Sequence, residues 1–196
     1  MSRAGLARLI AFAGIALFAW AASARRAPPV DLGPVPDFTL TDEAGRTVTR
    51  ASLAGSVWIA DFIFTRCAGQ CPLMSSQMAL LQRAFARVPG VQLVSFTVDP
   101  EHDAPPVLAA YAAHYKAQAG RWRFLTGSRE AVWRLAREGF QLGVGEDGTA
   151  EEPITHSVRL VLVDRAGRIR GYYDATDAAA VQRLRGDVRR LLGPHP

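Results

Sequence analysis

The hydrophobic and polar positions beyond residue 34 predict a chain in which strands and helices alternate. A partly alternating stretch at 35–55, with a turn at Gly45, indicates a hairpin. The apolar run at 56–64 indicates a strand buried on both faces. Further strands are predicted at 91–98, 122–125, 157–163 and 168–173, and helices at 73–88, 107–118, 128–138 and 177–192. The predicted fold class is α/β, a mixed sheet flanked by helices.

The order of these elements narrows the topology. Three strand–helix repeats are followed by a hairpin, which turns at 165–167, and by a last helix. A mixed sheet that ends in such a hairpin matches a thioredoxin-like arrangement. Two polar residues are expected to cap helices, Ser128 for the helix at 128–138 and Asp103 for the helix at 107–118.

A hydrophobic segment precedes the predicted domain. Residues 9–24 carry no charge and follow Arg3 and Arg8, which is the basic-then-apolar order of a targeting segment. As a helix these residues would span about 24 Å, short of a hydrocarbon core of roughly 30 Å. The small residues at 22–24 also fit a cleavage site. The segment is therefore a signal peptide or a membrane anchor, and either one exports the rest of the chain.

Charge and length set the domain count and the class of partner. The chain has 196 residues and a net charge of +5, but four of its arginines lie in the first thirty positions. Residues 31–196 are nearly neutral and contain no dense basic stripe, so we expect no nucleic-acid partner. We expect residues 1–26 to be the targeting segment, 27–36 a linker and 37–196 one domain.

The only two cysteines, Cys67 and Cys71, lie between the buried strand and the helix that follows it. Pro72 is tolerated in a first helical turn, which places Cys71 at the helix N-terminus and Cys67 just before it. The helix dipole there favours thiolates over thiols. Three chemistries remain open on spacing alone: a structural disulfide, a thiol–disulfide exchange centre and a two-sulfur clamp for a soft metal ion.

The position of a distant histidine favours the metal clamp among these three chemistries. His156 precedes the predicted strand at 157–163, whose start faces the cysteine loop in a thioredoxin-like topology. Two thiolates and one imidazole make a trigonal site that copper(I) accepts, and copper(II) can use it with one further ligand. Asp99 follows the neighbouring strand, so its carboxylate could reach the same cavity, and helix capping or turn formation is its structural alternative. His102 is a spare ligand or a solvent-facing loop residue.

Three stretches together resemble the Sco/SenC family of copper-binding proteins, which assist the assembly of cytochrome c oxidase. The resemblance runs from about residue 36 to 173. It is carried by DFIFTRCAGQCPLMSSQM (61–78), VSFTVDPEHDAP (94–105) and THSVRLVLVDRAGRIRGYY (155–173).

The resemblance implies a thioredoxin-like fold and an N-terminal membrane anchor. It also implies that Cys67, Cys71 and His156 bind copper and that Asp99 assists copper(II) binding or transfer. Thr155 departs from the family pattern, because an aspartate often stands before the histidine. This departure removes a carboxylate near the metal, and it leaves open whether the site holds copper(II) as well as copper(I).

The leading hypothesis is an exported copper chaperone, anchored at the periplasmic face of the inner membrane. It would pass one copper ion to the copper-receiving subunit of a respiratory oxidase, without being an enzyme in the turnover sense. The alternative is a thiol–disulfide oxidoreductase in which Cys67 attacks and Cys71 resolves the mixed disulfide. Zinc would need a fourth protein ligand, which only Asp99 or His102 offers. Met74 and Met78 are expected to pack in the core.

Overall fold

The computed structural model describes residues 30–67, 69–146, 148–149 and 154–193. Its centre is a seven-stranded mixed sheet in the order β2-β1-β5-β4-β3-β8-β9. The strands are β1 (Thr39–Asp42), β2 (Thr47–Thr49), β3 (Val57–Ile63), β4 (Val91–Thr97), β5 (Trp122–Thr126), β8 (Arg159–Val163) and β9 (Ile169–Asp174). The hairpin of β1 and β2 and the α/β class predicted from the hydrophobic pattern are confirmed.

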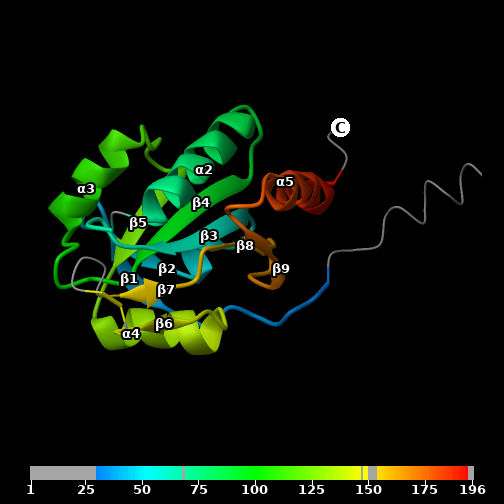
Figure 1. Cartoon of the computed structure of the whole chain (residues 1–196). Coiled ribbons are helices and arrows are strands. Elements are labelled where there is room, and N and C mark those ends of the chain that lie inside the picture. The colour runs from blue at the N-terminus through cyan, green and yellow to red at the C-terminus, as the bar shows by residue number, and fades with distance from the viewer. Residues whose placement is uncertain (1–29, 68, 147, 150–153, 194–196) are drawn as a thin grey trace, which may run out of the picture.

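Helices cover both faces of this sheet (Figure 1). They are α2 (Cys71–Ala84), α3 (Pro105–His114), α4 (Arg129–Arg134) and α5 (Ala178–Leu192), with a short turn η1 (Ala51–Leu53) and a wider turn η2 (Leu135–Gly139) that continues α4. Helices α2 and α3 lie on one face and α4 on the other. The side chains of Ser128 and Asp177 cap α4 and α5 through backbone N–H groups, so the cap predicted at Ser128 is confirmed.

The position of β3 at the centre of the sheet explains why it is almost entirely apolar, with Asp61 as the exception. β3 runs parallel to β4, with Phe62 opposite Phe96, and antiparallel to β8, with Ile59 opposite Leu162. It is therefore enclosed by strands on both edges and by helices on both faces, and all seven of its residues are buried. Because β3 and β4 are parallel, the loops that follow them emerge at the same edge of the sheet.

The helix cap predicted at Asp103 is wrong. Helix α3 begins at Pro105, its cap position is Ala104, and no side chain caps it. Pro105 and Pro106 occupy the first turn, where a missing N–H costs little. Asp103 is instead fully buried and turned toward the loop after β3.

The hydrophobic segment predicted at 9–24 lies outside the described residues, and the signal or anchor stays a prediction. Within the described ranges, we find no helix that is both long and apolar enough to cross a bilayer. The described part of the expected linker already contacts the domain: the backbone N–H groups of Leu32 and Val35 donate to the carbonyls of Ile169 and Gly167.

Candidate metal centre

The two cysteines lie where β3 passes into α2. Cys71 is the first residue of α2, as predicted, and it is fully buried. Cys67 lies in the preceding loop and is 8% exposed, so it is the more accessible of the two sulfurs. No disulfide joins the two sulfurs.

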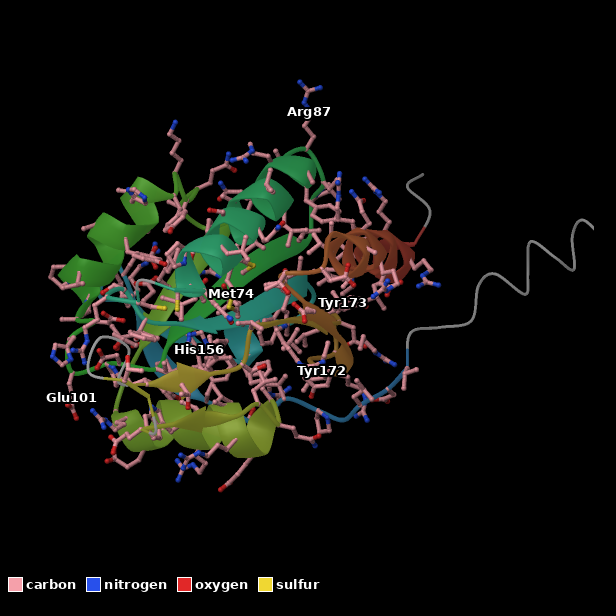
Figure 2. All side chains as sticks on the ribbon, viewed as in Figure 1. Met74, Arg87, Glu101, His156, Tyr172 and Tyr173 are labelled. Carbon is pink, nitrogen blue, oxygen red and sulfur yellow. The ribbon has the colours of Figure 1, made fainter. Side chains whose placement is uncertain are left out.

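His156 is placed by a small ladder that the sequence pattern did not reveal. It belongs to β7 (Thr155–His156), which pairs antiparallel with β6 (Val144–Gly145), and His156 lies opposite Val144. The prediction that it precedes β8 directly is wrong by two residues, because β8 begins at Arg159. The buried ring of Phe64 packs edge-on against the imidazole, with 5.7 Å between ring centroids. Figure 2 labels His156 on strand β7.

These elements bring three soft or intermediate donors together. The ligand atoms of Cys67, Cys71 and His156 all lie within 4.8 Å of one another. Sγ of Cys71 lies 3.0 Å from Nε2 of His156, and Nδ1 lies 3.2 Å from the carbonyl of Ser157. A neutral ring with its proton on Nδ1 donates to that carbonyl and leaves the lone pair of Nε2 directed at the sulfurs. A backbone acceptor of this kind orients many metal-binding histidines.

Burial, not the helix dipole, dominates the ionisation of the inner cysteine. Burial raises the pKa of the Cys71 thiol, nearby Cys67 and Asp61 raise it further, and a backbone hydrogen bond from Phe64 lowers it. The prediction that the helix N-terminus favours a thiolate at Cys71 is therefore wrong for the metal-free protein. A metal ion that binds here must displace the thiol proton.

The group is open to solvent on one side. A pocket of about 350 Å³ is lined by Cys67 and His156, with Phe64, Gln70 and Thr149 among its other lining residues. Cys71 does not line it. An incoming ion or ligand would therefore meet Cys67 and His156 first and Cys71 behind them.

Two thiols and one imidazole in this arrangement suit a soft ion. Copper(I) accepts three such ligands, whereas a structural zinc site almost always has four. Neither Asp99 nor His102, the candidates for a fourth ligand, belongs to the clustered group. The donor set therefore fits copper(I) better than zinc.

Comparisons with known proteins identify the family of this chain. The family model described as SCO1/SenC matches residues 31–193. The chain belongs to this family. It is 34% identical to the "SCO1 protein homolog" of Bacillus subtilis (strain 168) over 157 residues, which cover 79% of this chain and 81% of that protein.

Solved Sco structures share the fold. A structure of BsSco, described as a member of the Sco family of cytochrome c oxidase assembly proteins with a disulfide switch, has a TM-score of 0.76 and 31% identity, and the match covers 86% of this chain and 100% of that one. Copper-bound ScoI of Bradyrhizobium japonicum has a TM-score of 0.65 at 22% identity, and the match covers 82% and 99%. The thioredoxin-like fold predicted from the sequence is thereby confirmed.

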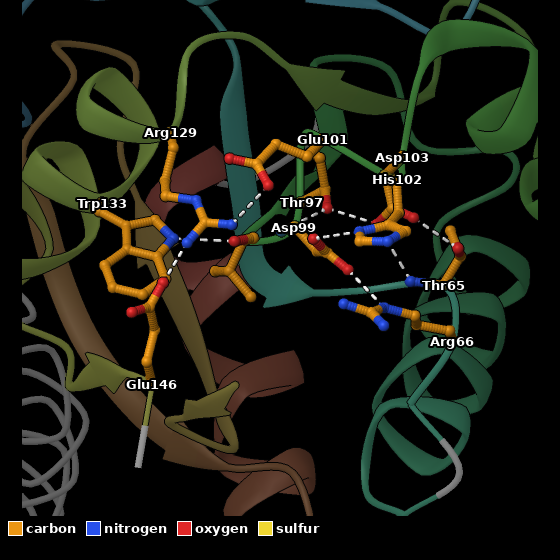
Figure 3. Close-up of polar contacts among 11 residues, drawn as sticks. Thr65, Arg66, Thr97, Asp99, Glu101, His102, Asp103, Arg129, Trp133 and Glu146 are labelled. Atoms are coloured by element: carbon orange, nitrogen blue, oxygen red, sulfur yellow. Dashed lines mark hydrogen bonds and ion pairs between the residues drawn. The ribbon is translucent and has the colours of Figure 1, made fainter. Parts of the chain in front are cut away.

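The structure of this Sco chain does not bring Asp99 to the three donors. Its carboxylate is fully buried and accepts hydrogen bonds from Nε of Arg66 at 2.7 Å and, on the other oxygen, from Nδ1 of His102 at 2.9 Å (Figure 3). Arg66 directly precedes Cys67 in the chain. Asp99 therefore supports the cysteine loop through Arg66, and a role as copper ligand stays a prediction.

A second buried carboxylate holds the same loop. Asp103 accepts hydrogen bonds from the backbone N–H and the hydroxyl of Thr65 and from the hydroxyl of Thr97 (Figure 3). Three donors on one carboxylate compensate for its burial. The sequence reasoning missed this contact, although two aspartates four positions apart after a buried strand were a usable signal.

A third buried acid, Asp61, interrupts the apolar run of β3. It is fully buried, and neither carboxyl oxygen has a hydrogen-bond partner among the described residues. Burial raises the pKa of Asp61 to about 7, and the hydroxyl of Ser95, outside hydrogen-bonding geometry, lowers it only in part. Near neutral pH this group is poised between its neutral and charged forms.

The two methionines of α2, Met74 and Met78, are fully buried in the core, as predicted.

Proposed function

We propose that this Sco chain is a copper chaperone that holds one copper(I) ion between the thiolates of Cys67 and Cys71 and Nε2 of His156. The observation that carries the proposal is the convergence of these donors, from positions 67, 71 and 156, within 4.8 Å. Soft thiolates with one imidazole are a donor set that favours copper(I).

We further propose that the recipient is the binuclear copper site of cytochrome c oxidase. Family membership supports this destination, since a matching structure is described as an oxidase assembly protein. Delivery by ligand exchange requires an accessible side, which the pocket along Cys67 and His156 provides. The hydrophobic segment at 9–24 supports an exported protein held at the periplasmic face of the inner membrane.

The test is anaerobic titration of the purified, reduced protein with copper(I) against a competing chelator. We expect one copper(I) per chain, lost in Cys67→Ser and Cys71→Ser and weakened at least about 100-fold in His156→Ala, which removes a first ligand. His114→Ala is the matched control, because His114 is an exposed histidine on α3. Unchanged copper(I) affinity in His156→Ala would reject the proposed site.

The accessibility difference between the cysteines favours a second candidate function, thiol–disulfide exchange. The thiolate of Cys67 would attack a partner disulfide, one partner thiol would leave, and Cys71 would displace the second thiol as the Cys67–Cys71 disulfide forms. Two electrons and two protons thus pass to the partner. The discriminating assay is reduction of the oxidised oxidase copper domain by the metal-free protein. Fast reduction together with weak copper(I) binding would make this the main activity.

A further inference from the structure

A groove between α2 and α5 lies outside the metal centre. It has a volume of about 530 Å³ and is lined from α2 by Leu80, Leu81 and Ala84 and from α5 by Val181, with the side chains of Gln77, Arg83, Ala178, Gln182 and Arg185 around it. Leu80 is 50% exposed, which is unusual for a leucine beside a groove that could bury it. The floor is thus apolar and only partly covered by the protein's own side chains.

The charged residues that line this groove are all cationic. Arg83 and Arg185 have no carboxylate partner among the described residues, and Arg185 donates a long hydrogen bond, 3.5 Å, to the side chain of Gln182. Its Nε is shielded from solvent and has no hydrogen-bond partner in the described part of the chain. The groove on the opposite side, beside α4, is different, because Asp37 and Glu138 line it together with Arg134. The α2–α5 groove is therefore complementary to an apolar group flanked by negative charge.

The side of α2 that lines the groove runs to the end of the helix that bears Cys71, although Cys71 itself is buried on the opposite side. Leu73, Gln77, Leu80 and Ala84 follow one another at helical spacing and lie on one side of the helix. Leu73 is 41% exposed and stands two residues after Cys71. Leu80 stands nine positions after Cys71, which is about 14 Å along the helix at 1.5 Å per residue. A molecule that is seated in the groove and extends along this side of α2 would reach the helix end next to the cysteine loop.

The shape and charge of the groove select among its occupants. A flat bilayer cannot fill a concave groove between two helices. A second copy of this chain, paired through the same surface, would bring two cationic surfaces together, which is unfavourable. A protein segment with an apolar side chain flanked by carboxylates would fit the groove, because the apolar side chain can pack on its floor and the carboxylates can pair with its arginines. Arginine is enriched at protein–protein interfaces.

We propose that the groove and the exposed α2 face are the docking surface for the copper-receiving protein. This proposal rests on the function proposed above. That protein inserts an apolar side chain beside Leu80 and places carboxylates on Arg83 and Arg185. Docking and metal exchange then use adjacent but separate parts of α2.

The experiment measures docking and copper binding separately. The probe is the soluble copper-receiving domain of the oxidase from the source organism. The variants are Leu80→Asp and the double variant Arg83→Glu/Arg185→Glu, and the matched controls are Val30→Asp, at an exposed valine, and Arg134→Glu, on α4. For each protein we would measure thermal unfolding, copper(I) affinity, affinity for the domain at low and high salt, and the rate of copper transfer to it.

We expect both groove variants to bind the domain at least about tenfold more weakly and to transfer copper correspondingly more slowly. Their copper(I) affinities and those of the controls should stay within about twofold of the unmodified protein. Binding of the unmodified protein should weaken with salt, and the arginine variant should lose this dependence. Two variants of different chemistry keep the test valid if Leu80→Asp unfolds.

The other outcomes distinguish failure of the docking proposal from failure of the proposed function. If the groove variants bind the domain like the unmodified protein, the docking proposal is rejected and the proposed function stands. If docking depends on the groove but no copper passes, delivery is rejected and the docking surface stands. If the unmodified protein binds copper but never the domain, both are rejected. Groove-dependent binding to phosphatidylglycerol vesicles, or groove-dependent self-association, without binding to the domain would also overturn the proposal.

Discussion

Sγ of Cys71 lies 3.0 Å from Nε2 of His156, although 85 positions separate the two residues in the chain. Cys71 begins α2 at the end of β3, and His156 reaches the same point from the β6–β7 ladder. A thiol buried against an imidazole, with a second thiol beside it, is a group of donors prepared for one soft ion.

Copper(I) binding should strengthen as pH rises. Burial raises the pKa of the Cys71 thiol, so the metal-free protein carries a proton there at neutral pH and the metal must displace it. Each displaced proton makes the apparent affinity rise by about tenfold per pH unit. Chelator competition between pH 6 and 8 measures the slope. Affinity independent of pH would show that no thiol proton is released.

Asp61→Asn should change how stability depends on pH. The pKa of Asp61 is about 7 in the folded protein and about 3.9 in an unfolded chain, so between these values the folded state retains a proton that the unfolded state loses. The shifted carboxyl therefore lowers the free energy of unfolding progressively as pH rises from about 4 to about 7, by on the order of 4 kcal/mol in total. Below about pH 4 it has no such effect, because both states are protonated.

Urea unfolding at pH 5 and pH 8 checks this expectation. The free energy of unfolding of Asp61→Asn, relative to that of the unmodified protein, should be higher at pH 8 than at pH 5. Parallel pH profiles for the two proteins would contradict a shifted pKa at Asp61.

Asp103→Ala should destabilise the protein and weaken copper(I) binding together. The substitution leaves the donors of Thr65 and Thr97 without their acceptor, at a cost of about 3 kcal/mol, and it releases the loop two residues before Cys67. Asp177→Ala is the matched control, because this aspartate caps α5 by one hydrogen bond and should cost about 1 kcal/mol. Chemical unfolding and copper(I) titration distinguish the two, and equal copper(I) affinities would contradict a positioning role for Asp103.

Asp99→Asn should affect the affinities for copper(I) and copper(II) differently. The carboxylate is held by Arg66 and His102 outside the three-donor group, so we expect copper(I) affinity to stay within about twofold. Carboxylate oxygen is a harder donor that suits copper(II), so loss of copper(II) affinity is expected if Asp99 leaves Arg66 to bind it. Chelator competition for copper(I) and the visible absorption of the copper(II) complex measure the two. A large loss for copper(I) would contradict the expectation that Asp99 matters for copper(II) alone.

Much of the scaffold followed from local patterns in the sequence. The apolar run of β3, the turn at Gly45 and the cap at Ser128 are encoded by neighbouring residues, and the structure agrees with each. Patterns failed where a residue's partner is distant. Asp103 looks like a helix cap in the sequence, yet its carboxylate bonds Thr65, 38 positions earlier. The β6–β7 ladder has two residues per strand, too short for an alternating pattern to appear.

The sequence by itself determined the fold class, the family and the three donors, because periodic burial and a distinctive set of soft ligands can be recognised residue by residue. The tertiary structure decided how those donors behave. Burial of Cys71 outweighs the helix dipole, and Asp99 is held by Arg66 and His102 instead of joining the metal group. Desolvation and competing ion pairs depend on which groups surround a side chain in space, and only the folded chain specifies those surroundings.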